Sequence, residues 1–143
     1  MKNNHKHSSE NISVKEVEAL IALGKGAHVE YDANLTWIDL FTAQVKKTPE
    51  KVGVADNDTQ LTYSELDRRS NILAHILIEK GVKPDDFVAV MLERTVRFPL
   101  VVWAIHKAGA AYVPIDLEYP QERIDYMLSD SAAKVVIDDA FMD

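Results

Sequence analysis

Side chains able to do chemistry are few in this sequence of 143 residues, and they match none of the common catalytic patterns. The chain has no cysteine, which excludes a thiol nucleophile, a disulfide scaffold and a cysteine-ligated zinc site. The patterns G-x-x-x-x-G-K-[ST], H-E-x-x-H and G-x-S-x-G and the EF-hand loop are all missing.

The histidines do not predict a metal site. His5 and His7 lie in the polar segment 1–12, which we expect to be a disordered tail. A mobile segment cannot preset the geometry of metal ligands. His75 and His106 fall on different predicted helices, and no third ligand converges with them.

Paired carboxylates and paired glycines also have simpler interpretations. Asp85 and Asp86, like Asp138 and Asp139, are adjacent, and neighbours in extended chain point to opposite sides. Neither pair is therefore expected to form an acid–base dyad. The run Gly24-Lys25-Gly26 follows a helical pattern and lacks the third glycine of a dinucleotide loop, so we interpret it as a helix end.

Composition narrows the class of protein further. Hydrophobic residues make up 47% and charged residues 27%, as in ordinary soluble domains. The net charge of −7 disfavours binding to nucleic acid or to anionic lipid. Apolar stretches such as 99–105 are too short to cross a bilayer, and the N-terminus lacks the apolar core of a secretory signal. We expect a cytoplasmic protein.

The first part of the chain predicts two helices joined by a connector. Ser13 precedes a helical apolar stripe and is followed three residues later by Glu16, the spacing of a capping box. Gly24 is expected to end this helix, and residues 24–34 form the connector. A second helix is expected over 35–47.

From residue 51 onward, short β patterns alternate with helical patterns, which indicates an α/β fold with a mostly parallel sheet flanked by helices. Thr95 is the expected N-cap of the helix over 93–108, and Pro99 is expected to make that helix start later or bend. Pro114 favours an end or edge position, and Pro120 is the expected first helical residue. Nothing follows to cover the last strand, so we expect an incomplete N-terminal part of a larger domain. The expected strands are 51–55, 60–62, 87–92, 111–115 and 134–137.

The helix expected from Tyr63 to Lys80 has the clearest helical period. One apolar face repeats at the spacing of a buried stripe, and charged residues fill the opposite face. Gly81 is the expected residue just past its end. The predicted inward residues are Leu66, Ser70, Leu73, Ala74, Leu77 and Ile78.

Three stretches together resemble the opening motifs of the adenylation domains of nonribosomal peptide synthetases, in the adenylate-forming enzyme superfamily. They are residues 61–66 (LTYSEL), 106–116 (HKAGAAYVPID) and 119–131 (YPQERIDYMLSDS), and the second departs from the family pattern at His106, where leucine is usual. The motif residues are Leu61, Thr62, Tyr63, Glu65, Leu66, Lys107, Ala108, Gly109, Tyr112, Val113, Pro114, Asp116, Pro120, Arg123 and Ile124.

These motif residues are interpreted as structural. Tyr63 stands between a strand and a helix, and Glu65 complements the dipole at that helix's start. Lys107 and Gly109 suit the end of another helix. Tyr112 is expected to place its hydroxyl in a polar cluster. We therefore assign no catalytic, cofactor-binding or metal-binding residue within this sequence.

The resemblance also implies a domain organisation. Residues 13–34 resemble the linker that joins an upstream condensation domain to the adenylation domain. The expected parts are a disordered tail over 1–12, a linker helix and connector over 13–34, and an adenylation-domain fragment over 35–143.

The activity implied by the resemblance is amino-acid activation with ATP and Mg²⁺, followed by transfer to the phosphopantetheine thiol of a carrier protein. In the family, the phosphate loop and the catalytic lysine come later than these motifs. The fragment alone is therefore expected to be inactive. Because a truncated parallel sheet leaves edge strands and apolar surface uncovered, we also expect self-association or a partner that covers this surface. Its implied partners are the rest of the adenylation domain, a condensation domain and a carrier protein, with no nucleic acid and no membrane.

Two alternatives remain open at this point. One is a free-standing ligase that activates amino acids or acyl groups; the sequence Tyr112-Val113-Pro114-Ile115-Asp116 resembles the amino-acid branch more closely. The other is a non-catalytic interaction or scaffold fragment. The substrate amino acid cannot be predicted from these residues.

Overall fold

The computed structural model describes residues 13–143, which divide between two units that meet at Ala33 and Asn34. The expected tail over 1–12, with His5 and His7, lies outside the described residues.

The first unit contains helix α1 (Val14–Gly24), and its predicted capping box is confirmed. The Ser13 hydroxyl accepts from the Glu16 N–H at 3.3 Å, and the Glu16 carboxylate accepts from the Ser13 N–H at 2.8 Å. The helix ends at Gly24 as expected, but without a left-handed glycine turn, because the next residue, Lys25, is extended. The apolar side chains of α1 are exposed.

The second unit opens with helix α2 (Trp37–Lys47), which starts at a capping box formed by Thr36 and Asp39. Strands β1 (Val52–Ala55) and β2 (Gln60–Thr62) then pair antiparallel, which confirms the predicted hairpin.

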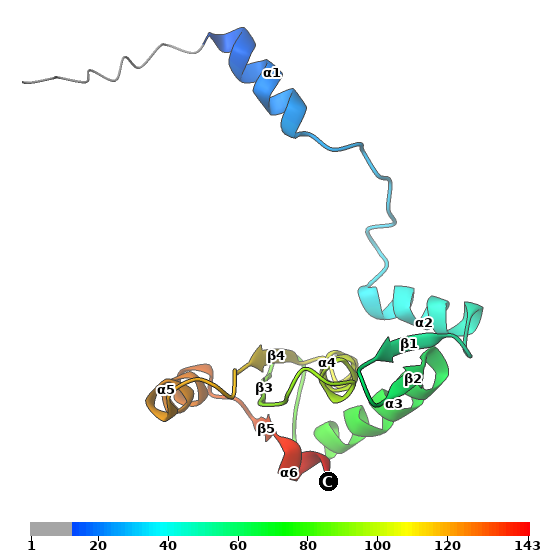
Figure 1. The fold of residues 1–143 in the computed structure, drawn as a ribbon, viewed down its shortest axis with the longest axis vertical. Helices are drawn as coiled ribbons and strands as arrows, with labels where there is room; N and C mark the ends of the chain where they lie inside the picture. The colour runs from blue at the N-terminus through cyan, green and yellow to red at the C-terminus, as the bar shows by residue number, and fades with distance from the viewer. Residues whose placement is uncertain (1–12) are drawn as a thin grey trace, which may run out of the picture. The chain divides into compact units, whose positions relative to one another are not determined.

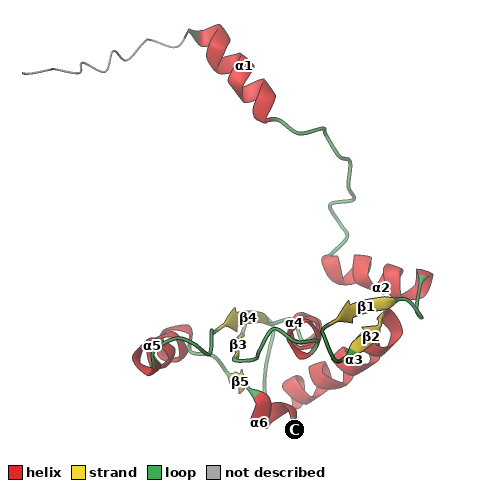
Figure 2. Ribbon diagram, viewed as in Figure 1, coloured by secondary structure: helices red, strands yellow, loops and turns green. Residues whose placement is uncertain are grey.

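A three-stranded parallel sheet follows, in the order β4-β3-β5 (Figure 2). Its strands are β3 (Phe87–Val90), β4 (Ala111–Pro114) and β5 (Val135–Ile137). The central strand is covered on both faces, since Val88, Ala89 and Val90 are almost completely buried. The α/β class and the edge position of Pro114 are therefore confirmed.

Helices cover both faces of this sheet (Figure 1). Helices α3 (Tyr63–Glu79) and α4 (Arg97–Lys107) pack on one face, around a core that includes Leu77, Val88 and Ile105. Helix α5 (Gln121–Ser131) packs on the other face, where Ile124 meets Ala89 and Ile115. Alternate residues of β3 thus point into two separate apolar cores.

Several local expectations are wrong. Helix α4 begins at Arg97, so Pro99 falls in its first turn, where a missing N–H is tolerated, and the N-cap is Val96 rather than Thr95. Pro120 is the N-cap of α5 and not its first residue. Ile78 is half exposed, although the other five predicted inward residues of α3 are buried. The short helix α6 (Asp139–Met142) was not predicted.

Candidate functional site

The first motif builds the start of α3. The Thr62 hydroxyl accepts from the Glu65 N–H at 3.2 Å, and the Glu65 carboxylate accepts from the Thr62 N–H at 2.9 Å. The Glu65 carboxylate also accepts from the Thr62 hydroxyl at 3.2 Å, and the bonds that it accepts from the Thr62 N–H and hydroxyl hold the pKa of Glu65 below its usual value. Leu61 and Leu66 are buried on either side of this cap, and Tyr63 packs against Gly53, where an added Cβ would lie 3.3 Å from the tyrosine ring.

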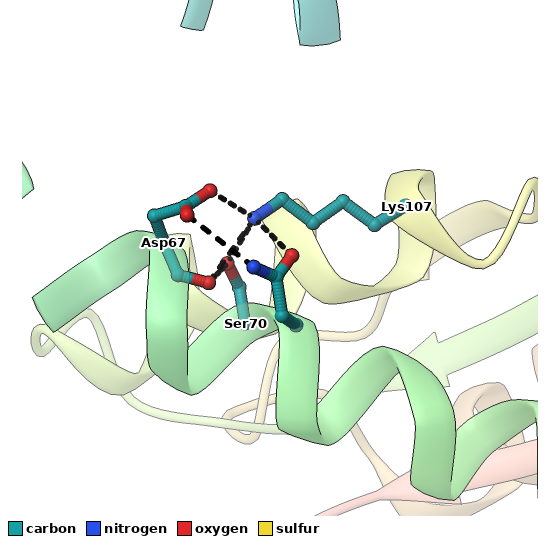
Figure 3. A network of polar contacts seen from close by, with 4 residues as sticks. Asp67, Ser70 and Lys107 are labelled. Carbon is teal, nitrogen blue, oxygen red and sulfur yellow. Dashed lines mark hydrogen bonds and ion pairs between the residues drawn. The ribbon is translucent and has the colours of Figure 1, made fainter. Parts of the chain in front are cut away.

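The second motif contains a partly buried polar network that joins α4 to α3 (Figure 3). The Lys107 ammonium donates to a carboxylate oxygen of Asp67 at 2.7 Å and to the Ser70 hydroxyl at 2.9 Å. It also donates to the side-chain oxygen of Asn71 at 2.8 Å. Lys107 was expected only to complement the end of α4, and the structure shows that it is the centre of a contact between two helices.

An aromatic cluster joins α2, α4 and β4. Trp103 stacks between Trp37 and Phe41, with ring centroids 4.1 and 3.9 Å away. His106 meets the Trp37 ring edge-on at 4.5 Å and the Tyr112 ring at 5.7 Å. Partial burial lowers the pKa of His106. These ring contacts place Tyr112 in the aromatic cluster, whereas a polar cluster was expected.

Asp56 fixes the beginning of α4 from the hairpin turn. One carboxylate oxygen accepts from the N–H groups of Asp58 and Thr59, and the other accepts from the Val96 N–H at 2.9 Å. The bonds from Val96, Asp58 and Thr59 lower the pKa of Asp56. Sequence reasoning missed this role, because the aspartate-rich turn 56–59 gave a signal for a turn and none for a partner forty residues away.

The end of the second motif and the start of the third shape the loop between β4 and α5. The Asp116 carboxylate accepts from the Glu118 N–H at 3.0 Å, which closes a tight turn. The Arg123 guanidinium lies 4.6 Å from the centre of the Tyr119 ring. Ile124 is buried in the second core, and Val113 packs against that core.

A cleft of about 1170 Å³ opens beside the carboxyl ends of β3 and β4. It is bordered by the end of β1, by the segment 92–96 and by the loop 114–119, so that Glu93, Arg94, Asp116 and Tyr119 face it. In open α/β sheets, ligands bind outside the carboxyl ends of the strands. Of the motif residues, Pro114 and Asp116 are the two that the structure brings to this cleft.

Within residues 13–143, no group of three or more histidine, aspartate and glutamate side chains is arranged to hold a metal ion. Over the same range, no helix combines the length and the apolar character that a membrane span requires.

The sequence matches a known family over most of its length. Residues 41–142 match the family model described as "AMP-binding enzyme". Gramicidin S synthase 2 of Brevibacillus brevis is 43% identical over 126 residues, which cover 88% of this chain and 3% of that protein. Bacitracin synthase 2 of Bacillus licheniformis is 44% identical over 131 residues, which cover 90% of this chain and 5% of that protein. The chain thus spans only a small part of the relatives that it matches.

Solved structures show the same similarity. The nonribosomal peptide synthetase FmoA3, in a form described as bound to alpha-methyl-L-serine-AMP, gives a TM-score of 0.71 at 33% identity. That alignment covers 76% of this chain and 12% of the FmoA3 chain. The N-terminal subdomain of Klebsiella oxytoca NpsA gives a TM-score of 0.66 at 28% identity, covering 71% of this chain and 27% of that one. Sequence motifs, fold and relatives agree, and this chain belongs to the AMP-binding enzyme family, where it is similar to the adenylation domains of nonribosomal peptide synthetases.

Proposed function

We propose that this chain is part of an ATP-dependent, amino-acid-activating domain of a nonribosomal peptide synthetase. In the first half-reaction, an amino-acid carboxylate attacks the α-phosphate of ATP, which forms an aminoacyl-adenylate and releases pyrophosphate. In the second, the phosphopantetheine thiol of a carrier protein attacks the acyl carbon, and AMP leaves. Residues 35–143 are the proposed contribution to this domain, and residues 13–34 are the proposed linker.

One observation carries this proposal. FmoA3 is similar to this chain over 76% of its residues and is described with an amino acid joined to AMP, which is the product of the first half-reaction. The synthetase relatives, of which this chain covers a few per cent, support a multidomain protein over a free-standing ligase. A condensation domain before the chain, a carrier protein after it and a cytoplasmic location belong to the same proposal.

The part that this chain plays is structural. Mg²⁺, when bound in the complete domain, would neutralise charge on the phosphates. The described residues do not fit a magnesium site, because residues 13–143 contain no suitable cluster of carboxylates, and no step is assigned to the ion here. We infer that the cleft beside β3 and β4 forms one wall of the activation site, with the loop 114–119 as its border.

A hybrid protein tests the proposal. Residues 34–143 replace the aligned segment of FmoA3, and pyrophosphate exchange with ATP is measured with and without alpha-methyl-L-serine. We expect exchange that depends on the amino acid, because the replacement preserves the fold of the segment and leaves the rest of FmoA3 intact.

Two controls make the result interpretable. FmoA3 with the aligned segment deleted is expected to lose exchange, and residues 1–143 alone are expected to show none. A folded hybrid without exchange contradicts the proposed function. Robust exchange by residues 1–143 alone contradicts the assignment of a purely structural part to this chain.

A further inference from the structure

The Lys107 ammonium is held by oxygens that all belong to α3. Besides the side chains of Asp67, Ser70 and Asn71, it contacts the backbone carbonyl of Asp67 at 3.2 Å. The lysine side chain is only 10% exposed, and Ser70 is completely buried. The ammonium also lies 5.2 Å from the centre of the Phe41 ring, on α2.

This arrangement resists displacement for an electrostatic reason. A buried cation is costly unless its hydrogen bonds and its charge are satisfied. Asp67, Ser70 and Asn71 stand at positions i, i+3 and i+4 of α3 and therefore share one face of that helix. A small shift of the last turn of α4 would separate Lys107 from several partners at once, so the network fixes that turn against α3.

The chain leaves this fixed turn through a tight connection to β4. Gly109 adopts a φ of +81°, and an added Cβ would lie 3.4 Å from Pro84. The Gly109 carbonyl accepts from the Asp85 N–H at 3.0 Å, and Ala108 and Ala110 are buried. The segment between Lys107 and Ala111, the first residue of β4, is therefore held closely, so that the position of Lys107 constrains that of β4.

We propose that Lys107 is a positioning residue, which anchors α4 on α3 and thereby sets β4 and the loop 114–119 at the border of the cleft. The link to amino-acid activation rests on the proposed function. The anchoring of β4 does not, and it is measurable on residues 1–143 alone.

Amide hydrogen exchange separates this role from a general effect on stability. The Ile115 N–H bonds to the Val90 carbonyl on the β4 side of β3, and the Met91 N–H bonds to the Ile137 carbonyl on the β5 side. In Lys107→Met, we expect exchange at Ala111 and Ile115 to accelerate at least about tenfold more than exchange at Met91. A loss of global stability would instead accelerate amide exchange equally on both sides of the sheet.

Lys80→Met is the matched control. Lys80 also lies over an aromatic ring, 5.3 Å from the centre of Phe141, but no hydrogen bond of its ammonium is recorded among the described residues. Lys80→Met should leave unchanged the ratio of the amide exchange rates on the β4 side of β3 to those on the β5 side. Asp67→Asn is a milder second variant. It keeps the backbone carbonyl of residue 67, the Ser70 hydroxyl and the Asn71 oxygen near the ammonium but removes the negative charge, and it should accelerate exchange on the same side.

Equal acceleration on both sides in Lys107→Met and Asp67→Asn overturns the positioning role, as does a response no different from that of Lys80→Met. If Lys107→Met does not fold, the hydrogen-exchange result of Asp67→Asn decides whether the positioning role holds.

The link to the reaction is tested in the FmoA3 hybrid. There, Lys107→Met should lower the kcat of pyrophosphate exchange at least about tenfold, because misplaced walls of the site slow the reaction. The activity is measured at a temperature where circular dichroism shows that the variant hybrid is folded. An inactive parent hybrid counts against the proposed function alone, and full activity of the variant overturns the link to the reaction.

Discussion

Asp56 shows how one side chain can hold two distant segments together. Its two oxygens accept three backbone N–H bonds, one of them at the start of α4. Because these bonds lower its pKa, Asp56 contributes stability that is complete above the ordinary aspartate pKa and is lost as the pH falls through the folded-state value.

We expect Asp56→Asn to lower the Tm at neutral pH, because an amide NH₂ would face one set of backbone donors. The variant should also lose less of its stability than the wild type as the pH falls below about 4. Thermal unfolding followed by circular dichroism across this range measures both effects. Asp58→Asn, in the same exposed turn, is the control, and an equal Tm for the two variants contradicts the role assigned to Asp56.

His106 predicts a second pH dependence. Burial lowers its pKa, so the unfolded chain binds a proton before the folded one as the pH falls. Above the ordinary histidine pKa of about 6.5, His106 therefore leaves the free energy of unfolding unaffected. Below that pH, the free energy of unfolding decreases as the pH falls towards the lower pKa that His106 has in the folded state.

We expect His106→Leu to remove this loss, since leucine fills the position without titrating. Urea unfolding, followed by the fluorescence of Trp37 and Trp103, gives the free energy of unfolding between about pH 5 and 7.5. His75→Leu, on the exposed side of α3, should keep the slope of the wild type. If the free energy of unfolding depended on pH in the same way in all three proteins, His106 would not be the cause of that dependence.

At the scale of elements, turns with positive φ decide how helices pass into strands. Gly81 and Gly109 follow α3 and α4 with φ values of +91° and +81°. Only Gly109 is crowded, with Pro84 close to the place of a Cβ, whereas nothing lies within 4 Å at Gly81.

We expect Gly109→Ala to reduce the free energy of unfolding by about 1–2 kcal/mol for the left-handed conformation, plus a further cost for displacing Pro84. Gly81→Ala should show the conformational cost without the crowding. Gly24→Ala, at an open position in α1 without positive φ, should be close to neutral. Urea denaturation ranks the three variants, and a Gly109→Ala stability equal to that of Gly24→Ala would refute this explanation of the turn.

At the scale of the whole molecule, the three-stranded sheet has two outer edges that no other strand within residues 13–143 pairs with. Over this range, strands β4 and β5 each pair only with β3, and Val136 on β5 is 36% exposed. Unpaired edges with apolar side chains promote pairing between chains.

We expect residues 1–143 to self-associate, with an average mass in sedimentation equilibrium that rises with concentration. Val136→Lys should weaken this association, because a charge on an edge strand opposes pairing. Asn57→Lys adds the same charge in the hairpin turn and should have less effect. A monomer at all concentrations would contradict this prediction.

The sequence by itself determined the features that depend on near neighbours. The capping box at Ser13 is set by a spacing of three residues, and the alternation of strands and helices follows from local apolar periods. The family resemblance rests on the same contiguous motifs, and the AMP-binding match over residues 41–142 confirms it.

Only the tertiary structure decided which distant groups meet. Lys107 and Asp67 are forty residues apart, as are Val96 and Asp56, and no local pattern encodes either pair. These partners come together only when α3 packs on α4 and when the β1–β2 hairpin packs beside the start of α4. Polar side chains that suit a solvated helix face or an exposed turn equally suit a buried contact, so their types could not distinguish the two outcomes before the packing was known.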